Sequence, residues 1–339
     1  MAEFFRSLKD VETVLETSRN RSVVIASPAF LAGFALVPGE EIPEEIERMI
    51  DDNLLVSLWE EYFDIYDTIV RARGEDHIVV VENELKLPQI LPNNQIESQP
   101  LPIPEQFISK QQAVNWLESF YCYWPRNAYL EVDGQIFFFP EAWRGIDGLV
   151  SLSYLGDGGR VLAKQDAIIV TPTIWNLAGN DLDKMRARGF KVAVIPTVNP
   201  VKQKFNFCQR DIDGHSQLIE GSNDQLHLLV ARSFFNQGRY QGQDTQKVIE
   251  SSCRETDVNL VVIDDRRLPP LSLNLLQLDN QAVVFTGPAD STLGKVLKEI
   301  VGKDKIFPTQ QPIRLIPQKS KGGIGCLTNL LPEQLKAAM

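Results

Sequence analysis

Cys326, near the C-terminal end of the sequence, is the residue whose surroundings best suit covalent chemistry. Glycines occupy positions 322, 323 and 325, and an alternating apolar and polar run follows at 327–331. Glycine lets the backbone approach a ligand closely, and the backbone N–H groups of such a loop favour a thiolate. Cys326 is therefore a candidate nucleophile. The structural alternative is a turn before a short C-terminal helix, with Cys326 as an ordinary buried side chain.

Three further short stretches that could carry chemistry precede this glycine-rich loop. In chain order they are Trp124-Pro125-Arg126-Asn127, Asp157-Gly158-Gly159 and Asp213-Gly214-His215-Ser216-Gln217. Each also has a structural interpretation, in which Asp157 and His215 are turn residues next to glycine and the Trp124-Pro125 pair packs in the core without a ligand role. The alternative is that all four stretches contribute to a single site, and their order along the chain favours this interpretation.

Together, the four stretches resemble the pentein superfamily of guanidino-group-modifying enzymes, and within it the agmatine and arginine deiminases and the amidinotransferases. In that superfamily an Arg-Asp pair, an acidic Glu-Gly-Gly-Asp turn, a His-x-Asp segment and a C-terminal cysteine converge on one guanidinium. The resemblance covers roughly residues 115–335, and residues 1–110 match it least. It implies an α/β fold, a fivefold pseudosymmetric α/β propeller with the site in its central channel.

The resemblance also implies a role for each site residue. Cys326 would be the nucleophile, His215 the general acid/base, and Asp157 the acid that contacts a substrate nitrogen. The residues implied to bind substrate are Arg126, Asn127, Asp213, Gln217 and Asn274, the last of these in a segment (271–278) similar to the family's penultimate hairpin.

The chemistry requires these residue types. A guanidinium carbon is a poor electrophile, so a thiolate must attack it while the departing amine takes up a proton. The implied function is a cysteine-dependent hydrolase of a guanidino compound such as arginine or agmatine, which acts through a covalent thiol intermediate.

Two positions depart from the family pattern. Asn127 and Gln217 stand where the Arg-Asp pair and the His-x-Asp segment carry aspartates. Amides accept hydrogen bonds from a guanidinium but cannot neutralise its charge. Asp211 or Asp213 would supply a carboxylate if the strand register were shifted. Three functions stay open: the hydrolase, an amidinotransferase in which an amine resolves the same intermediate, and a catalytically inactive pentein that binds a ligand or a protein.

The amino-acid composition limits the classes of partner and cofactor that this protein is expected to bind. The net charge of −11 argues against nucleic acid and against an anionic membrane surface as partners. Four cysteines far apart in the sequence and three histidines suggest neither a metal site nor a disulfide framework, and no nucleotide motif or other cofactor is indicated. The N-terminus lacks a signal-peptide core and no run of 18 apolar residues occurs, so we expect a cytoplasmic protein. The resemblance to the pentein superfamily implies that its partner is a small guanidino substrate. Formation of a homo-oligomer is left open.

The elements that must position these residues alternate along the chain. Strands are expected at 77–81, 129–132, 135–139, 167–171, 191–196, 226–231, 259–263 and 313–316, the last delivering the Cys326 loop. Helices are expected at 3–18, 42–66, 109–121, 181–188, 244–255 and 292–301, and a hairpin joins 271–278 to 282–286. Residues 86–106 contain five prolines and are expected to form a loop. We expect one domain over 1–339.

Overall fold

The computed structural model describes residues 23–26, 52–81, 89–90, 96–97, 126, 129–132, 135–138, 150–152, 158–171, 175–195, 211–240, 243–320 and 322–330. The helices expected at 3–18 and 109–121 lie outside the described residues, as does the first part of the helix expected at 42–66. Within the proline-rich segment 86–106, β3 (Gln89–Ile90) pairs antiparallel with β4 (Ile96–Glu97).

Five three-stranded sheets contain most of the described strands. Their strands are β1 (Val23–Ala26), β2 (Ile78–Val81) and β19 (Thr328–Leu330); β5 (Tyr129–Val132), β6 (Gln135–Phe138) and β7 (Val150–Ser151); β8 (Val161–Lys164), β9 (Ala167–Val170) and β10 (Lys191–Val194); β11 (Ser216–Glu220), β12 (Leu226–Ala231) and β15 (Asn259–Ile263); β16 (Leu276–Gln277), β17 (Val283–Phe285) and β18 (Ile306–Pro308). A two-stranded ladder joins β13 (Arg239–Tyr240) to β14 (Gln243–Asp244).

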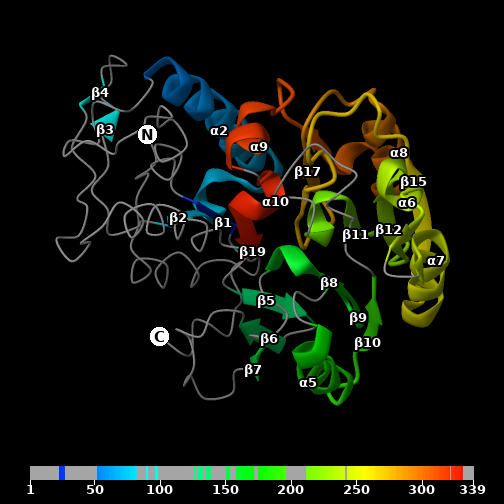
Figure 1. The fold of residues 1–339 in the computed structure, drawn as a ribbon. Helices are drawn as coiled ribbons and strands as arrows, with labels where there is room; N and C mark the ends of the chain where they lie inside the picture. The colour runs from blue at the N-terminus through cyan, green and yellow to red at the C-terminus, as the bar shows by residue number, and fades with distance from the viewer. Residues whose placement is uncertain are drawn as a thin grey trace, which may run out of the picture.

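The described helices connect or flank these sheets (Figure 1). The α-helices are α2 (Asp52–Arg73), α5 (Trp175–Arg186), α6 (Arg232–Phe235), α7 (Thr245–Thr256), α8 (Thr292–Val301), α9 (Leu315–Ser320) and α10 (Ile324–Leu327), and the 3-10 turns are η3 (Glu75–His77), η6 (Gly158–Arg160), η8 (Ile212–Gly214) and η9 (Lys303–Lys305).

All five sheets repeat one topology. In each, the central strand pairs antiparallel with one neighbour and parallel with the other, as in β8-β9-β10 and β11-β12-β15. Four sheets are built from consecutive parts of the chain. In the fifth, β19 from the C-terminal part pairs antiparallel with β1, and β1 pairs parallel with β2. That module therefore depends on residues about 300 positions apart, as the adjacent blue and red segments in Figure 1 show.

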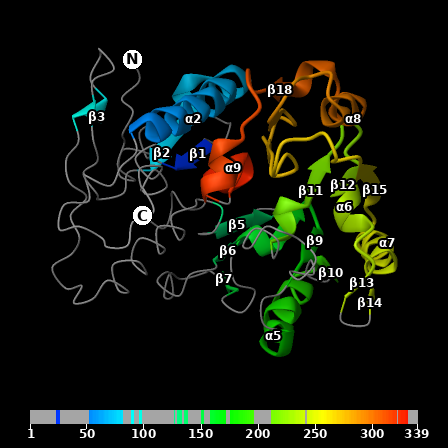
Figure 2. The same ribbon diagram turned by 45° about the horizontal axis from the view of Figure 1, so that its top comes forward.

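Neighbouring sheets meet through the first strand of each. Strand β8 contacts both β5 and β11. Strand β11 is joined to β16 by two hydrogen bonds, in which Glu220 N donates to Gln277 Oε1 (2.8 Å) and Gln277 Nε2 donates to the Glu220 carbonyl (2.7 Å). The turned view in Figure 2 shows β11 between β9 and the α8–β18 region. This chain of contacts places the loops that precede β11 and β16 close together, and those loops carry Asp213 and Asn274.

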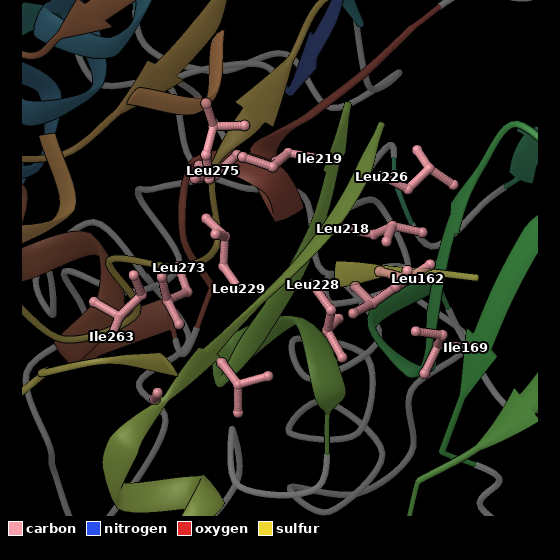
Figure 3. Close-up of a cluster of buried hydrophobic side chains, with 14 of the residues drawn as sticks. Leu162, Ile169, Leu218, Ile219, Leu226, Leu228, Leu229, Ile263, Leu273 and Leu275 are labelled. Carbon is pink, nitrogen blue, oxygen red and sulfur yellow. The ribbon is translucent and has the colours of Figure 1, made fainter. Parts of the chain in front are cut away.

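The largest hydrophobic cluster lies on both faces of the β11–β12 pair. Successive strand residues point to opposite faces. In Figure 3, Leu228 therefore points toward Leu162 of β8, whereas Ile219 and Leu229 point toward the segment with Leu273 and Leu275. Burial on both faces explains why β12 is an almost uninterrupted apolar run, which is typical of a strand covered on both sides.

Local signals account for several elements that the sequence predicts. Helix α8 begins after Ser291, whose side chain accepts a hydrogen bond from Gly294 N, and ends at Gly302 with φ 92°. A serine N-cap and a C-terminal glycine are the usual boundaries of a helix. The predictions of a helix at 292–301 and a strand at 259–263 are confirmed. The two strands of the predicted hairpin pair antiparallel over 129–132 and 135–138.

The strand predicted at 313–316 is wrong, because this segment enters helix α9. The carboxylate of Glu61 in α2 accepts backbone N–H groups from Arg314 (2.7 Å), Leu315 (2.9 Å) and Ile316 (2.8 Å). The first N–H groups of a helix have no partner within the helix, so a carboxylate placed there stabilises the helical end. This carboxylate comes from a helix about 250 residues earlier, which the local pattern of 313–316 does not reveal.

Candidate functional site

Cys326 lies in the short helix α10, between the glycine-rich loop and β19. Two of the loop glycines stand where a larger side chain would not fit. A Cβ on Gly323 would lie 2.9 Å from Asn274 Oδ1, and one on Gly325 would lie 2.9 Å from both Arg126 Nη1 and the Leu275 carbonyl. Gly323 itself has an ordinary φ of −120°. The glycines therefore let the Cys326 backbone approach Asn274 and Arg126 closely.

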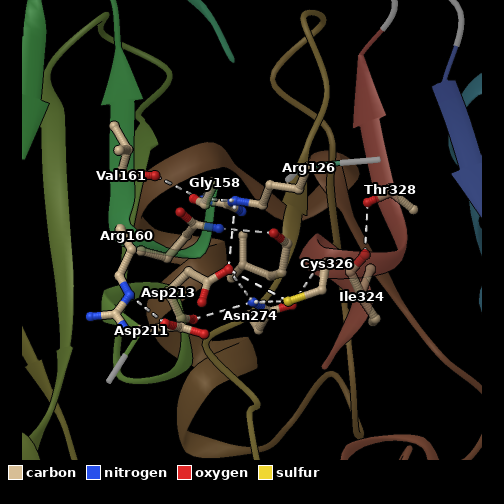
Figure 4. A network of polar contacts seen from close by, with 12 residues as sticks. Arg126, Gly158, Arg160, Val161, Asp211, Asp213, Asn274, Ile324, Cys326 and Thr328 are labelled. Atoms are coloured by element: carbon tan, nitrogen blue, oxygen red, sulfur yellow. Dashed lines mark hydrogen bonds and ion pairs between the residues drawn. The ribbon is translucent and has the colours of Figure 1, made fainter. Parts of the chain in front are cut away.

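A polar cluster surrounds the Cys326 thiol (Figure 4). Asn274 Nδ2 lies 3.2 Å from Cys326 Sγ and donates to Asp213 Oδ2 at 2.8 Å. The Cys326 backbone N–H donates to Asn274 Oδ1 at 2.9 Å, and the thiol lies 3.5 Å from Asp213 Oδ2. Arg126 Nε is 3.6 Å from the same carboxylate oxygen. The structure thus brings four of the predicted site residues together: Cys326, Asn274, Asp213 and Arg126.

Arg126 also fixes the turn that follows the predicted Asp157-Gly-Gly motif. Its guanidinium donates to the carbonyls of Gly158 (3.4 Å) and Val161 (3.5 Å). A Cβ on Gly158 would lie 1.9 Å from the Arg126 carbonyl oxygen, so the position requires glycine. Asn127 and Asp157 lie outside the described residues, and their roles stay predictions.

A second Arg-Asp pair lies beside the first. Arg160 Nε is 2.7 Å from Asp211 Oδ1, and the Arg160 side chain is buried. The sequence offered either Asp211 or Asp213 as a replacement carboxylate. In the structure, Asp211 pairs with Arg160, while Asp213 reaches the thiol. Sequence reasoning missed Arg160, although a charged residue directly before a buried strand was a usable signal.

Burial raises the pKa of the Cys326 thiol well above its ordinary value, and the nearby Asp213 carboxylate raises it further. The backbone N–H at Gly323 and the Arg126 guanidinium act in the opposite direction. The expected effect of the glycine-rich backbone is therefore present but smaller than that of burial. At neutral pH the group is a neutral thiol, so a nucleophilic thiolate requires a proton acceptor.

His215 directly follows Gly214, two residues after Asp213, but the contacts of its ring are with other elements. The ring packs against Phe234 of α6 with the centroids 5.5 Å apart, and its buried Nε2 has no hydrogen-bond partner among the described residues. Burial lowers the pKa of His215 to about 4, while the Asp265 carboxylate acts weakly to raise it. His215 is a neutral imidazole at neutral pH, and its acid/base role stays a prediction.

The side-chain amide of Gln217 forms its hydrogen bonds with the protein backbone. Its Nε2 donates to the Leu275 carbonyl at 2.9 Å, and its Oε1 accepts from Leu218 N at 3.1 Å. The side chain is 6% exposed, so these bonds satisfy a buried amide where the family pattern has a carboxylate. A direct contact of Gln217 with substrate stays a prediction.

In the part of the chain that the structure describes, no group of three or more His, Cys, Asp or Glu side chains could hold a metal ion. Among the helices of that part of the chain, none is long and apolar enough to cross a membrane.

Solved structures share the fold of this chain. The DDAH of Pseudomonas aeruginosa in complex with citrulline superposes with a TM-score of 0.50 at 10% identity, over 92% of this chain and 99% of that chain. SxtG, an amidinotransferase from Microseira wollei in saxitoxin biosynthesis, gives 0.50 at 13% identity, over 91% and 93%. The N-terminal domain of ArgZ, an arginine dihydrolase from the ornithine-ammonia cycle in cyanobacteria, gives 0.50 at 12% identity, over 92% and 97%.

These structures are α/β enzymes of the pentein superfamily, so the chain has the pentein fold and the expected fold class is confirmed. No protein-family model and no curated protein sequence matches the chain. The similarity to these solved structures therefore concerns the fold. The closure of the five sheets into a propeller stays a prediction.

Proposed function

We propose that this chain is a cysteine-dependent hydrolase that cleaves a C–N bond of a guanidino compound of the arginine or agmatine type. The observation that supports it most directly is the Cys326 thiol, which lies 3.5 Å from the Asp213 carboxylate and 3.2 Å from the Asn274 amide, in a chain with the pentein fold. A nucleophile next to a proton acceptor, with a third group that bonds both, is the arrangement that covalent catalysis requires.

In the first step, the Cys326 thiolate attacks the guanidino carbon and forms a C–S bond. The C–N bond then breaks, the leaving nitrogen takes the electron pair and a proton, and an amidino-thioether remains. In the second step, water attacks the thioether carbon and forms a C–O bond, the C–S bond breaks with its electron pair on sulfur, a proton from the water restores the thiol, and a ureido product leaves. His215 acts as general acid/base and Asp157 contacts a substrate nitrogen. The other substrate-binding residues are Arg126, Asn127, Asp213, Gln217 and Asn274.

The charge of the site favours a cation that carries N–H groups. Asp213 is buried with 2% exposure, and the Arg126 guanidinium lies 3.6 Å from its Oδ2. A substrate guanidinium would share this carboxylate with Arg126, and Asn127 would accept hydrogen bonds without adding charge. We therefore expect weaker ground-state binding than in a site with three free carboxylates.

The neutral state of His215 leaves a nitrogen lone pair available for the second step. Burial lowers the pKa of His215 to about 4, so the imidazole that accepts a proton from the attacking water is a weaker base than an ordinary histidine. The hydrolases and amidinotransferases with this fold support the reaction class. In an amidinotransferase, an amine would attack the same thioether in place of water.

The proposal is tested by a screen of guanidino and ureido compounds for release of ammonia or urea. Wild type is compared with Cys326→Ala and with Cys253→Ala as the matched control. Cys253 is buried outside the site, and burial raises the pKa of its thiol to about 11. We expect turnover in wild type and in Cys253→Ala, and at least a 1,000-fold loss in Cys326→Ala, roughly the effect of deleting a covalent nucleophile.

Each alternative function gives a different result. An amidinated amine that forms without ammonia, when an amine acceptor is added, would identify an amidinotransferase. If wild type releases nothing from any compound, with or without an amine acceptor, the chain is a non-catalytic pentein that binds a ligand or a protein, and the proposal is overturned.

A further inference from the structure

Asn274 connects three groups of the candidate site through one carboxamide. Its Oδ1 accepts the Cys326 backbone N–H at 2.9 Å, while its Nδ2 lies 2.8 Å from Asp213 Oδ2 and 3.2 Å from Cys326 Sγ. The backbone takes part as well, because the Asn274 carbonyl accepts Gly325 N at 3.0 Å. Asn274 is 2% exposed, so its amide has these partners in place of water.

The planar amide fixes the orientation of the nucleophile. The two hydrogens on Nδ2 point in directions about 120° apart, so a donor that serves both a carboxylate and a sulfur holds the two acceptors side by side. The oxygen of the same amide fixes the backbone that carries the sulfur. The loop also fits closely around this side chain, since a Cβ on Gly323 would lie 3.0 Å from the Asn274 Cβ.

We propose that Asn274 is a positioning residue that holds the Cys326 thiol against the Asp213 carboxylate, and that Asp213 receives the thiol proton when the nucleophile forms. The geometry supports this pairing directly, because the thiol lies 3.5 Å from Asp213 Oδ2. The part of the inference that concerns catalysis rests on the proposed function. The part that concerns the state of the thiol does not.

The proton transfer balances within the site. The S–H bond breaks, the proton passes to Asp213 Oδ2, and sulfur keeps the electron pair with which it bonds to the guanidino carbon. When the C–N bond breaks, the leaving nitrogen takes its electron pair and receives that proton, which restores the carboxylate. The other charged groups that act on the thiol are Arg126, whose Nε is 3.6 Å from Asp213 Oδ2, and the more distant Asp211.

The test measures how fast iodoacetamide alkylates Cys326 at pH 8 in the substrate-free protein, followed by mass-spectrometric mapping. Only the thiolate reacts, so the rate reports the ionised fraction. Asp213→Asn removes a negative charge beside the sulfur and should raise the rate at least about tenfold. Asn274→Ala removes a donor that stabilises the thiolate and should lower the rate about tenfold.

Gln277→Ala is the matched control. Gln277 is a buried amide three positions further along that also bonds backbone groups, those of Glu220, but not Cys326. Its variant should leave the rate within about twofold of wild type. A loop that simply loosened would expose the thiol and raise the rate in Asn274→Ala, which is opposite to the expected direction.

The positioning role is overturned if Asn274→Ala alkylates as fast as Gln277→Ala, or faster. The role of Asp213 is overturned if Asp213→Asn fails to raise the rate. Both results are obtained without substrate, so they remain decisive even if the wild-type protein proves to have no turnover. Where turnover is found, Asp213→Asn should raise alkylation but lower turnover, a split that a purely structural residue would not produce.

Discussion

His215 is a buried imidazole whose state can be followed through protein stability. Burial lowers its pKa to about 4 in the folded protein, whereas an unfolded chain gives a histidine pKa of about 6.5. Above pH 6.5 the group is neutral in both states and has no effect on the pH dependence of stability. Between pH 6.5 and 4, the unfolded chain binds a proton that the folded protein does not. Stability therefore falls as the pH is lowered through this window.

The change that tests this is His215→Gln. We expect wild type to lose about 3 kcal/mol of unfolding free energy between pH 6.5 and 4 from this group alone, and the variant to lack that component. Urea unfolding at both pH values measures it. His227→Gln is the comparison, because burial lowers the pKa of His227 as well but that residue is less buried. Equal pH dependence in wild type and His215→Gln would show that His215 titrates normally.

At the scale of elements, α2 supports the segment that leads to the Cys326 loop. One face of this helix is buried in the core and includes Leu58, Tyr62 and Ile65. Glu61 and Asp64 lie on one flank of this face, on the same turns, and are half-buried. Asp64 accepts backbone N–H groups from Gln310 and Gln311, both at 2.8 Å, and Glu61 accepts three at the start of α9. A single helix thus fixes the backbone on both sides of residue 312.

Glu61→Gln should destabilise the protein by about 1–3 kcal/mol, because an amide nitrogen would replace one of the accepting oxygens and leave an N–H of α9 without a partner. Denaturant unfolding measures the loss, and hydrogen exchange at residues 314–316 should become faster. Glu60→Gln, at the exposed position directly before Glu61, is the control and should change stability by less than about 0.5 kcal/mol. Equal stability of the two variants would mean that the Glu61 contacts do not maintain α9.

At the scale of the whole molecule, the last residue of α2 joins two modules. Arg73 forms a two-pronged ion pair with Asp279 in the turn between β16 and β17, at 2.7 and 2.9 Å. The Arg73 side chain is 2% exposed and that of Asp279 is 22% exposed. Residues 206 positions apart are thereby held together, in addition to the hydrophobic cluster that both modules share.

Arg73→Met should lower the unfolding free energy by about 1–3 kcal/mol, because it removes a two-pronged ion pair whose arginine side chain is 2% exposed. Arg186→Met is the contrast, since the Arg186–Asp183 pair is 50% and 77% exposed and exposed pairs contribute about 0–1 kcal/mol. Urea unfolding of both variants measures the difference. A loss for Arg73→Met no greater than that for Arg186→Met would show that the pair does not hold the modules together.

Local patterns in the sequence determined the elements whose boundaries are set by neighbouring residues. Ser291 and Gly302 limit α8, the apolar run 259–263 is β15, and the strands on either side of Asp133-Gly134 pair antiparallel as expected. The order of four short motifs led to the pentein fold. Strand β11 was missed because Ser216-Gln217 looks polar in isolation, whereas its pairing with β12 buries both side chains.

Only the tertiary structure decided which of these residues meet. Leu315 and Ile316 are helical because Glu61 accepts their N–H groups, and β19 pairs with β1, about 300 residues earlier in the chain. Asp213 and Cys326 are 113 positions apart, and their contact depends on how successive sheets pack through their first strands. Caps and periodicity act over a few residues, so they fix helices and strands. Contacts across the fold depend on the summed packing of every module between the two residues, and no local pattern contains that information.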